Sequence, residues 1–170
     1  MDKIAIRDAL PEDAAALISL QKMVFGETNF LLFAPDEYLA SPEDVSAQLA
    51  KVASSGSSRR LLAETQDTLV GFLGVSGSPV PRLRHSAQLV IGILRSHWHR
   101  GIGQALLSEA IRWAPTAGLS RLELFVMKSN SRAISLYERV GFCVEGHRRR
   151  AYIIDGVSID DQLMAYVFDA

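Results

Sequence analysis

Two glycines stand where an apolar segment gives way to a helix, and their spacing suits phosphate binding. Gly101 and Gly103 follow the apolar segment 87–94 and a polar turn, and they open a stretch of helical periodicity that ends near residue 114. The first N–H groups of a helix lack intrahelical partners and lie at the positive end of its dipole, so they bind anions such as pyrophosphate. Glycine also lets a ligand come close to the backbone. The segment predicts a phosphate cradle, although an isolated Gly-x-Gly fits a tight turn equally well.

A second segment, further along the chain, carries a tyrosine in a helical pattern. Asn130 precedes a stripe of helical period that includes Ala133 and Tyr137, and Gly141 ends it. Taken singly, Asn130 fits a helix N-cap, Tyr137 a core aromatic residue and Gly141 a left-handed C-cap. A phenol on the inward stripe of a helix is also able to give a proton to a leaving group. From the residues alone, a structural role is open for each of them, and a role as proton donor is open for Tyr137.

Together, the two segments resemble the hallmark motifs of the GNAT family of N-acetyltransferases. The first is similar to motif A of that family, commonly [Gln/Arg]-x-x-Gly-x-[Gly/Ala], except that Trp98 stands at the Gln/Arg position. Segment 130–142 matches the pattern Asn-x-x-Ala-x-x-Leu-Tyr-x-x-x-Gly-Phe at every fixed position. The resemblance covers essentially the whole chain. It implies an enzyme that transfers the acetyl group of acetyl-CoA directly to an amine within a ternary complex.

The resemblance also implies roles for individual residues. Motif A binds the pyrophosphate, the end of the preceding strand pairs with the pantetheine amides, and an N–H there polarises the thioester carbonyl. Tyr137 protonates the departing CoA thiolate. The residues expected to contact acetyl-CoA are Ile93, Leu94, Trp98, His99, Arg100, Gly101, Ile102, Gly103, Gln104, Asn130, Arg132 and Ala133.

The group that deprotonates the acceptor amine is harder to identify. Relatives often carry a glutamate near the position of Gln88, and a glutamine cannot act as a base. His85 is our candidate base because an imidazole titrates near neutral pH, although a loop histidine is the plainer interpretation. Glu27 and Glu64 are outside candidates. Loops commonly carry specificity, so we expect the acceptor to contact Glu27, Thr28, Asn29 and Phe30.

The acceptor itself is expected to be a primary amine of a small molecule, such as an amino acid, or a peptide N-terminus. The alternative is a catalytically silent acetyl-CoA sensor. Trp98 and Gln88 depart from the family pattern and support that alternative, whereas Tyr137 speaks against it.

These residues must be positioned by alternating helices and strands. Periodicity and turn residues predict the order β-α-α-β-β-β-α-β-α-β-β, with the strand at 87–94 buried on both faces. We expect an α/β protein with the GNAT fold, in one domain spanning residues 1–170. Its central sheet should be mixed but mostly antiparallel, with helices on both faces and splayed strands at the cofactor site. The expected strands are 4–7, 61–65, 69–75, 87–94, 122–126, 143–154 and 158–168, and the expected helices are 11–25, 103–114, 133–140 and one beginning at Ser41.

Composition narrows the class of protein. A formal net charge of −1 over 170 residues argues against a nucleic-acid or membrane-surface binder. Cys143 is the only cysteine and is expected in the core, and the histidines lack ligand spacing, so no metal site is expected. No signal peptide or spanning segment is apparent, which favours a cytoplasmic protein. Phe30, Phe33 and Tyr38 are expected to line either the acceptor cleft or a homodimer interface.

Overall fold

The elements of the computed structural model follow the order expected from the sequence. It describes residues 4–169, so residues 1–3 and 170 of the expected domain lie outside the described part. The strands and helices are β1 Ala5–Asp8, α1 Ala14–Glu27, α2 Pro42–Ala53, β2 Arg59–Thr65, β3 Thr68–Gly77, β4 Ser86–Ile93, α3 Ile102–Trp113, β5 Arg121–Met127, α4 Ser131–Arg139, β6 Cys143–Ile154 and β7 Val157–Val167.

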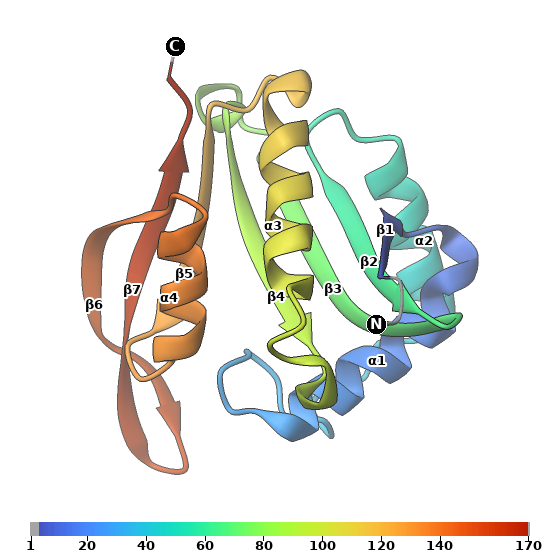
Figure 1. Ribbon diagram of the computed structural model, residues 1–170, viewed down its shortest axis with the longest axis horizontal. Helices are drawn as coiled ribbons and strands as arrows, with labels where there is room; N and C mark the ends of the chain where they lie inside the picture. Colours follow the sequence, from blue (N-terminus) through green and yellow to red (C-terminus); the bar gives the residue numbers. More distant parts are fainter. Residues whose placement is uncertain (1–3, 170) are drawn as a thin grey trace.

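The seven strands form one sheet in the order β1-β2-β3-β4-β5-β7-β6. Neighbouring strands are antiparallel except β4 and β5, which run parallel. The helices cover both faces, and Figure 1 shows α3 and α4 on the near side of the sheet. One core cluster packs these two helices against residues such as Leu73 and Leu124, and the other packs α1 and α2 against Leu62 and Phe72. The expected fold class is confirmed.

Local signals set the ends of several elements. The side chain of Ser41 accepts a hydrogen bond from the Asp44 N–H and caps α2. Gly141 ends α4 with φ +102°, and the β6–β7 turn places Asp155 and Gly156 at φ +50° and +76°, as a two-residue hairpin requires. These features match the sequence-based expectations.

The strands β4 and β5 separate along their length. They pair only from Ser86 to Gln88, opposite Arg121 to Glu123, and then diverge (Figure 1). On its other side, β4 stays paired with β3 along most of its length. The splay expected at the cofactor site is therefore present.

Backbone groups of β4 face the gap that this splay opens. Leu94 donates its N–H to the carbonyl of Val70 in β3, at an N···O distance of 3.0 Å. Successive residues of an antiparallel strand face opposite neighbours, so the N–H and C=O groups of Leu89, Ile91 and Ile93 point away from β3 and toward β5. The last β4–β5 pair, Gln88 opposite Glu123, still engages the Leu89 N–H. Beyond it, β5 no longer supplies partners for the Leu89 C=O or for the backbone groups of Ile91, and the Ile93 C=O is bound by the Trp98 side chain instead.

Two burial expectations were wrong. Strand β4 is not buried on both faces along its length, because Val90 is 45% exposed on the face where Gly92 packs against Val24 and Phe72. The reason is that α1 and α2 pack over β2 and β3 and leave this part of β4 uncovered. Cys143 is exposed rather than in the core, because β6 is an edge strand whose outer side has no covering helix. Within residues 4–169, no helix is both long and apolar enough to span a membrane.

Candidate active site

A pocket of about 420 Å³ lies where β4 and β5 diverge. Its walls come from both sides of the sheet, since Val24 and Leu31 belong to the core cluster of α1, and Leu136 and Tyr137 to that of α3 and α4. The splay therefore opens a passage between the two faces. Predicted site residues that line the pocket are Thr28, Phe30, Ile93, Trp98, His99, Gly101, Ile102, Gly103, Gln104, Asn130, Arg132, Ala133 and Tyr137.

Five predicted site residues do not line the pocket. Asn29 and Arg100 are exposed on their loops, and Leu94 pairs with β3 as described above. The carboxylate of Glu27 accepts a hydrogen bond from the Arg95 N–H at 2.6 Å, so it anchors the turn after β4. His85 is exposed at the opposite end of β4, where its carbonyl accepts hydrogen bonds from the start of β5 at 2.9 and 3.1 Å. The structure therefore separates His85 from the pocket.

The start of α3 opens onto the pocket with its backbone. Gly101 caps the helix with φ +78°, a left-handed conformation that glycine adopts without strain. The N–H groups of Ile102, Gly103 and Gln104 belong to the first turn and have no intrahelical acceptors. A side chain at position 103 would place its Cβ 2.7 Å from a methyl carbon of Leu136, so glycine permits the close approach of α3 to α4.

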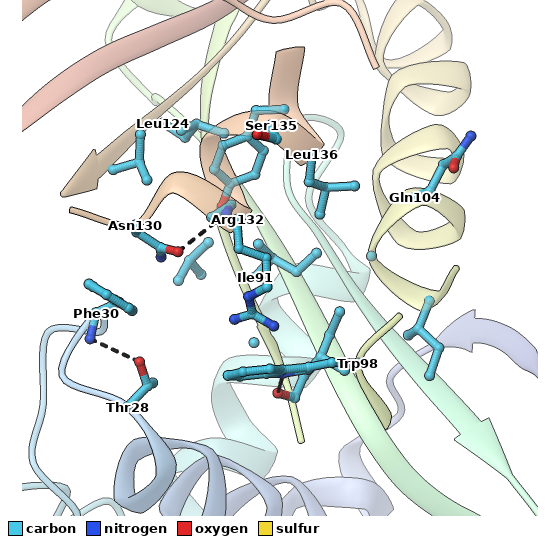
Figure 2. Close-up of a pocket in the computed structure, with 18 of the residues that line it drawn as sticks. Thr28, Phe30, Ile91, Trp98, Gln104, Leu124, Asn130, Arg132, Ser135 and Leu136 are labelled. Atoms are coloured by element: carbon cyan, nitrogen blue, oxygen red, sulfur yellow. Dashed lines mark hydrogen bonds between the residues drawn. The ribbon is translucent and has the colours of Figure 1, made fainter. Parts of the chain in front are cut away.

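Trp98 links the glycine turn to β4 and α4. Its indole N–H donates a hydrogen bond to the carbonyl of Ile93 at 2.8 Å. The guanidinium of Arg132 stacks on the ring, with its Cζ 3.1 Å from the ring centroid (Figure 2). Arg95 lies at 5.5 Å from the same ring. Trp98 thus takes the Gln/Arg position of the motif and joins three elements around the pocket.

Tyr137 and Asn130 approach the pocket from α4. Tyr137 is buried, and its ring centroid lies 6.0 Å from that of Phe142. Burial raises the pKa of Tyr137 to about 12, against the opposing effect of the nearby Arg132 charge, so the phenol is protonated at neutral pH. Asn130 Oδ1 accepts the Ala133 N–H at 3.2 Å and caps α4 (Figure 2). Its Nδ2 amide group is the part able to bind a ligand.

Because the pKa of Tyr137 is higher in the folded chain than its usual value of 10, the stability of the protein should depend on pH above that value. The protonated phenol contributes its full stabilisation below pH 10, and this contribution is lost as pH rises toward about 12. The free energy of unfolding in urea, measured from pH 9 to the highest pH at which unfolding is reversible, should fall more steeply for wild type than for Tyr137→Phe. Equal slopes for the two proteins would contradict the burial of an ionisable phenol.

Several lining residues were not found by sequence reasoning. Leu89 and Ile91 contribute backbone groups that carry no sequence signal, and they replace Leu94, whose N–H already pairs with β3. Val90 and Phe125 look like ordinary strand residues in the sequence. The expected aromatic cluster is divided, because Phe30 lines the pocket whereas the rings of Phe33 and Tyr38 pack on Phe25.

The charged groups that line the pocket are cationic. Arg132 and Arg139 line it, whereas no aspartate or glutamate among residues 4–169 does. The same residues also contain no group of three or more histidine, cysteine, aspartate or glutamate side chains arranged to hold a metal ion.

Known proteins are similar to this chain in sequence and in architecture. Residues 27–142 match the acetyltransferase (GNAT) family. The L-amino acid N-acetyltransferase AaaT of Escherichia coli (strain K12) is 30% identical over 169 residues, which cover 98% of this chain and 99% of that protein. A crystal structure of a GNAT-family acetyltransferase from Streptococcus pneumoniae superposes with a TM-score of 0.94 at 35% identity, over 98% of this chain and 100% of the other.

The structure of yncA from Salmonella typhimurium, which contains its cofactor acetyl-CoA, has the same fold with a TM-score of 0.87 at 19% identity, over 98% and 94% of the two chains. The family match spans both the glycine turn and the tyrosine helix, which are the segments that build the pocket. The chain belongs to the acetyltransferase (GNAT) family.

Proposed function

We propose that this protein transfers the acetyl group of acetyl-CoA to the primary amine of a small molecule, such as an amino acid, or of a peptide N-terminus. The observation that carries this proposal is the pocket that passes between the splayed strands and has walls on both faces of the sheet. Such a passage lets a donor and an acceptor approach one point from opposite sides. The name of the relative AaaT, an L-amino acid N-acetyltransferase, supports an amine acceptor. We also infer that residues 1–170 form a single domain.

The face of α3 and α4 carries the groups suited to acetyl-CoA. The first-turn N–H groups of α3 would bind the pyrophosphate, because they combine unpaired donors with the positive end of the helix dipole. The Asn130 amide, the C=O of Leu89 and the gap-facing backbone of Ile91 would pair with the amides of the pantetheine arm. Arg132, held against Trp98, adds a positive charge beside this path.

The chemistry then needs two contributions from the chain. A β4 N–H that faces the gap would donate a hydrogen bond to the thioester carbonyl oxygen as negative charge builds on it. The amine nitrogen forms a bond to the carbonyl carbon and releases one proton to water, and the carbon–sulfur bond breaks with its electron pair on sulfur. Tyr137 would give its proton to this thiolate and recover one later from solvent. The buried phenol is suited to this donation because it is protonated at neutral pH.

The proposal is tested by release of free CoA thiol from acetyl-CoA. The assay uses a panel of amino acids, monoamines, polyamines and short peptides, together with an amine-free control. Amine-dependent release with formation of the acetylated amine is the expected result. Tight binding of acetyl-CoA without release by any member would instead support the sensor alternative, and neither binding nor release would exclude both.

A further inference from the structure

The wall of the pocket on the α1 face is mostly apolar, with the hydroxyl of Thr28 as its uncharged polar group. Val90 on β4 and Phe125 on β5 face this side of the sheet, and Val24, Phe30 and Leu31 close it from α1 and the loop that follows. Val90 and Phe30 are 45% and 39% exposed, so their side chains are available to a ligand. The α3–α4 face holds the groups assigned to acetyl-CoA, which leaves this wall for the acceptor.

Carboxylates near this wall already have partners. Glu123 pairs with Arg121 at 2.8 Å, and the carboxylate of Glu27 accepts the N–H of Arg95 at 2.6 Å. Asp161 is fully buried and bound by the guanidinium of Arg148, which itself lies on the Phe125 ring with its Cζ 3.8 Å from the ring centroid. A positive charge on the acceptor would therefore meet a mostly apolar surface, since none of the carboxylates in residues 4–169 lines the pocket and these three are already bound.

The cations that line the pocket add to this effect. Arg132 and Arg139 would repel a second positive charge on the acceptor, and burial of an unpaired ammonium among apolar side chains carries a large desolvation cost. The same cost applies to the reacting amine, so its uncharged form is favoured in the pocket before attack. An amine that enters uncharged needs no deprotonation before attack, and the proton that its nitrogen loses on forming the amide passes to water.

We infer that the acceptor is an amine with an apolar side chain and no second positive charge, and that polyamines and other diamines are poor acceptors. This inference rests on the proposed function and narrows its acceptor class. The wall that makes the selection consists of Val24, Phe30, Leu31, Val90 and Phe125.

A matched pair of amines tests whether the pocket discriminates against a second positive charge on the acceptor. Hexylamine and 1,6-diaminohexane have the same chain and differ by one terminal amine, which is charged at neutral pH. With kcat/KM expressed per concentration of free reacting amine, wild type should prefer hexylamine by about tenfold or more. An equal or better rate with the diamine would overturn this inference and leave the acetyltransferase assignment intact. Failure of every amine would overturn both.

A carboxylate placed in the wall should change the preference. Val90→Glu and, separately, Phe30→Glu each add an unpaired acid beside the acceptor, and both positions are exposed enough to accept it. Each should raise the diamine-to-hexylamine ratio by about tenfold. Leu39→Glu is the matched control, because Leu39 is 86% exposed and lies outside the pocket lining. An unchanged ratio in both wall variants, or an equal change in the control, would contradict the assignment of this wall.

Discussion

Tyr137→Phe is expected to lower kcat by about a hundredfold, because the CoA thiolate would then leave without a positioned proton donor. Phenylalanine keeps the ring that packs against Phe142 at 6.0 Å and removes only the hydroxyl. The Kd for acetyl-CoA should therefore change by less than about threefold, since the phenol acts mainly when negative charge builds on sulfur. Initial rates of CoA release at saturating acceptor give kcat, and calorimetric titration gives the Kd.

The chain provides a matched control for this variant. Tyr166 also packs against Phe142, edge to face with ring centroids 5.8 Å apart, but it does not line the pocket. Tyr166→Phe should retain kcat within about twofold. If Tyr137→Phe kept wild-type kcat, the phenol would not be the proton donor. If both variants lost activity and stability equally, the effect would come from packing around Phe142.

Much of the fold was predictable because local signals mark where its elements end. Ser41 caps α2 by accepting a hydrogen bond from the Asp44 N–H, as expected because serine is a preferred N-cap residue. Gly141 and Gly156 occupy positive-φ positions where glycine is favoured, and both were expected at turns. The start of α3 was predictable for the same reason, since Gly101 supplies its left-handed cap.

The rest of the site depends on tertiary geometry that the sequence does not display. The apolar run of β4 predicted burial on both faces. In the structure α1 and α2 pack over β2 and β3 and do not cover Val90, which lies beside the open pocket. His85 is adjacent to β4 in the sequence, yet the pocket forms toward the other end of that strand. The strand pairing places Val90 beside the pocket and His85 away from it. Strands β4 and β5 stay paired near His85 and separate only after Gln88.

The replacement of Gln or Arg by Trp98 leads to the second large prediction. Trp98→Ala should raise the Kd for acetyl-CoA by about thirtyfold or more, because it removes the donor to the Ile93 carbonyl and the ring under Arg132 together. Trp98→Phe keeps an aromatic ring for Arg132 and loses only the N–H, so it should raise the Kd by about fivefold to tenfold. Calorimetric titration with acetyl-CoA measures both values.

The second tryptophan supplies both the control and a reporter. Trp113 also lies near an arginine, with the Arg59 Cζ 5.6 Å from its ring, but it is outside the pocket lining. Trp113→Phe should keep the wild-type Kd and leaves Trp98 as the only tryptophan, whose fluorescence should change on acetyl-CoA binding. A wild-type Kd in Trp98→Ala would show that the stack does not support the cofactor path. Trp98→Phe removes the hydrogen bond to Ile93 and retains a ring under Arg132. A Kd between those of wild type and Trp98→Ala would therefore separate the contribution of the hydrogen bond from that of the ring.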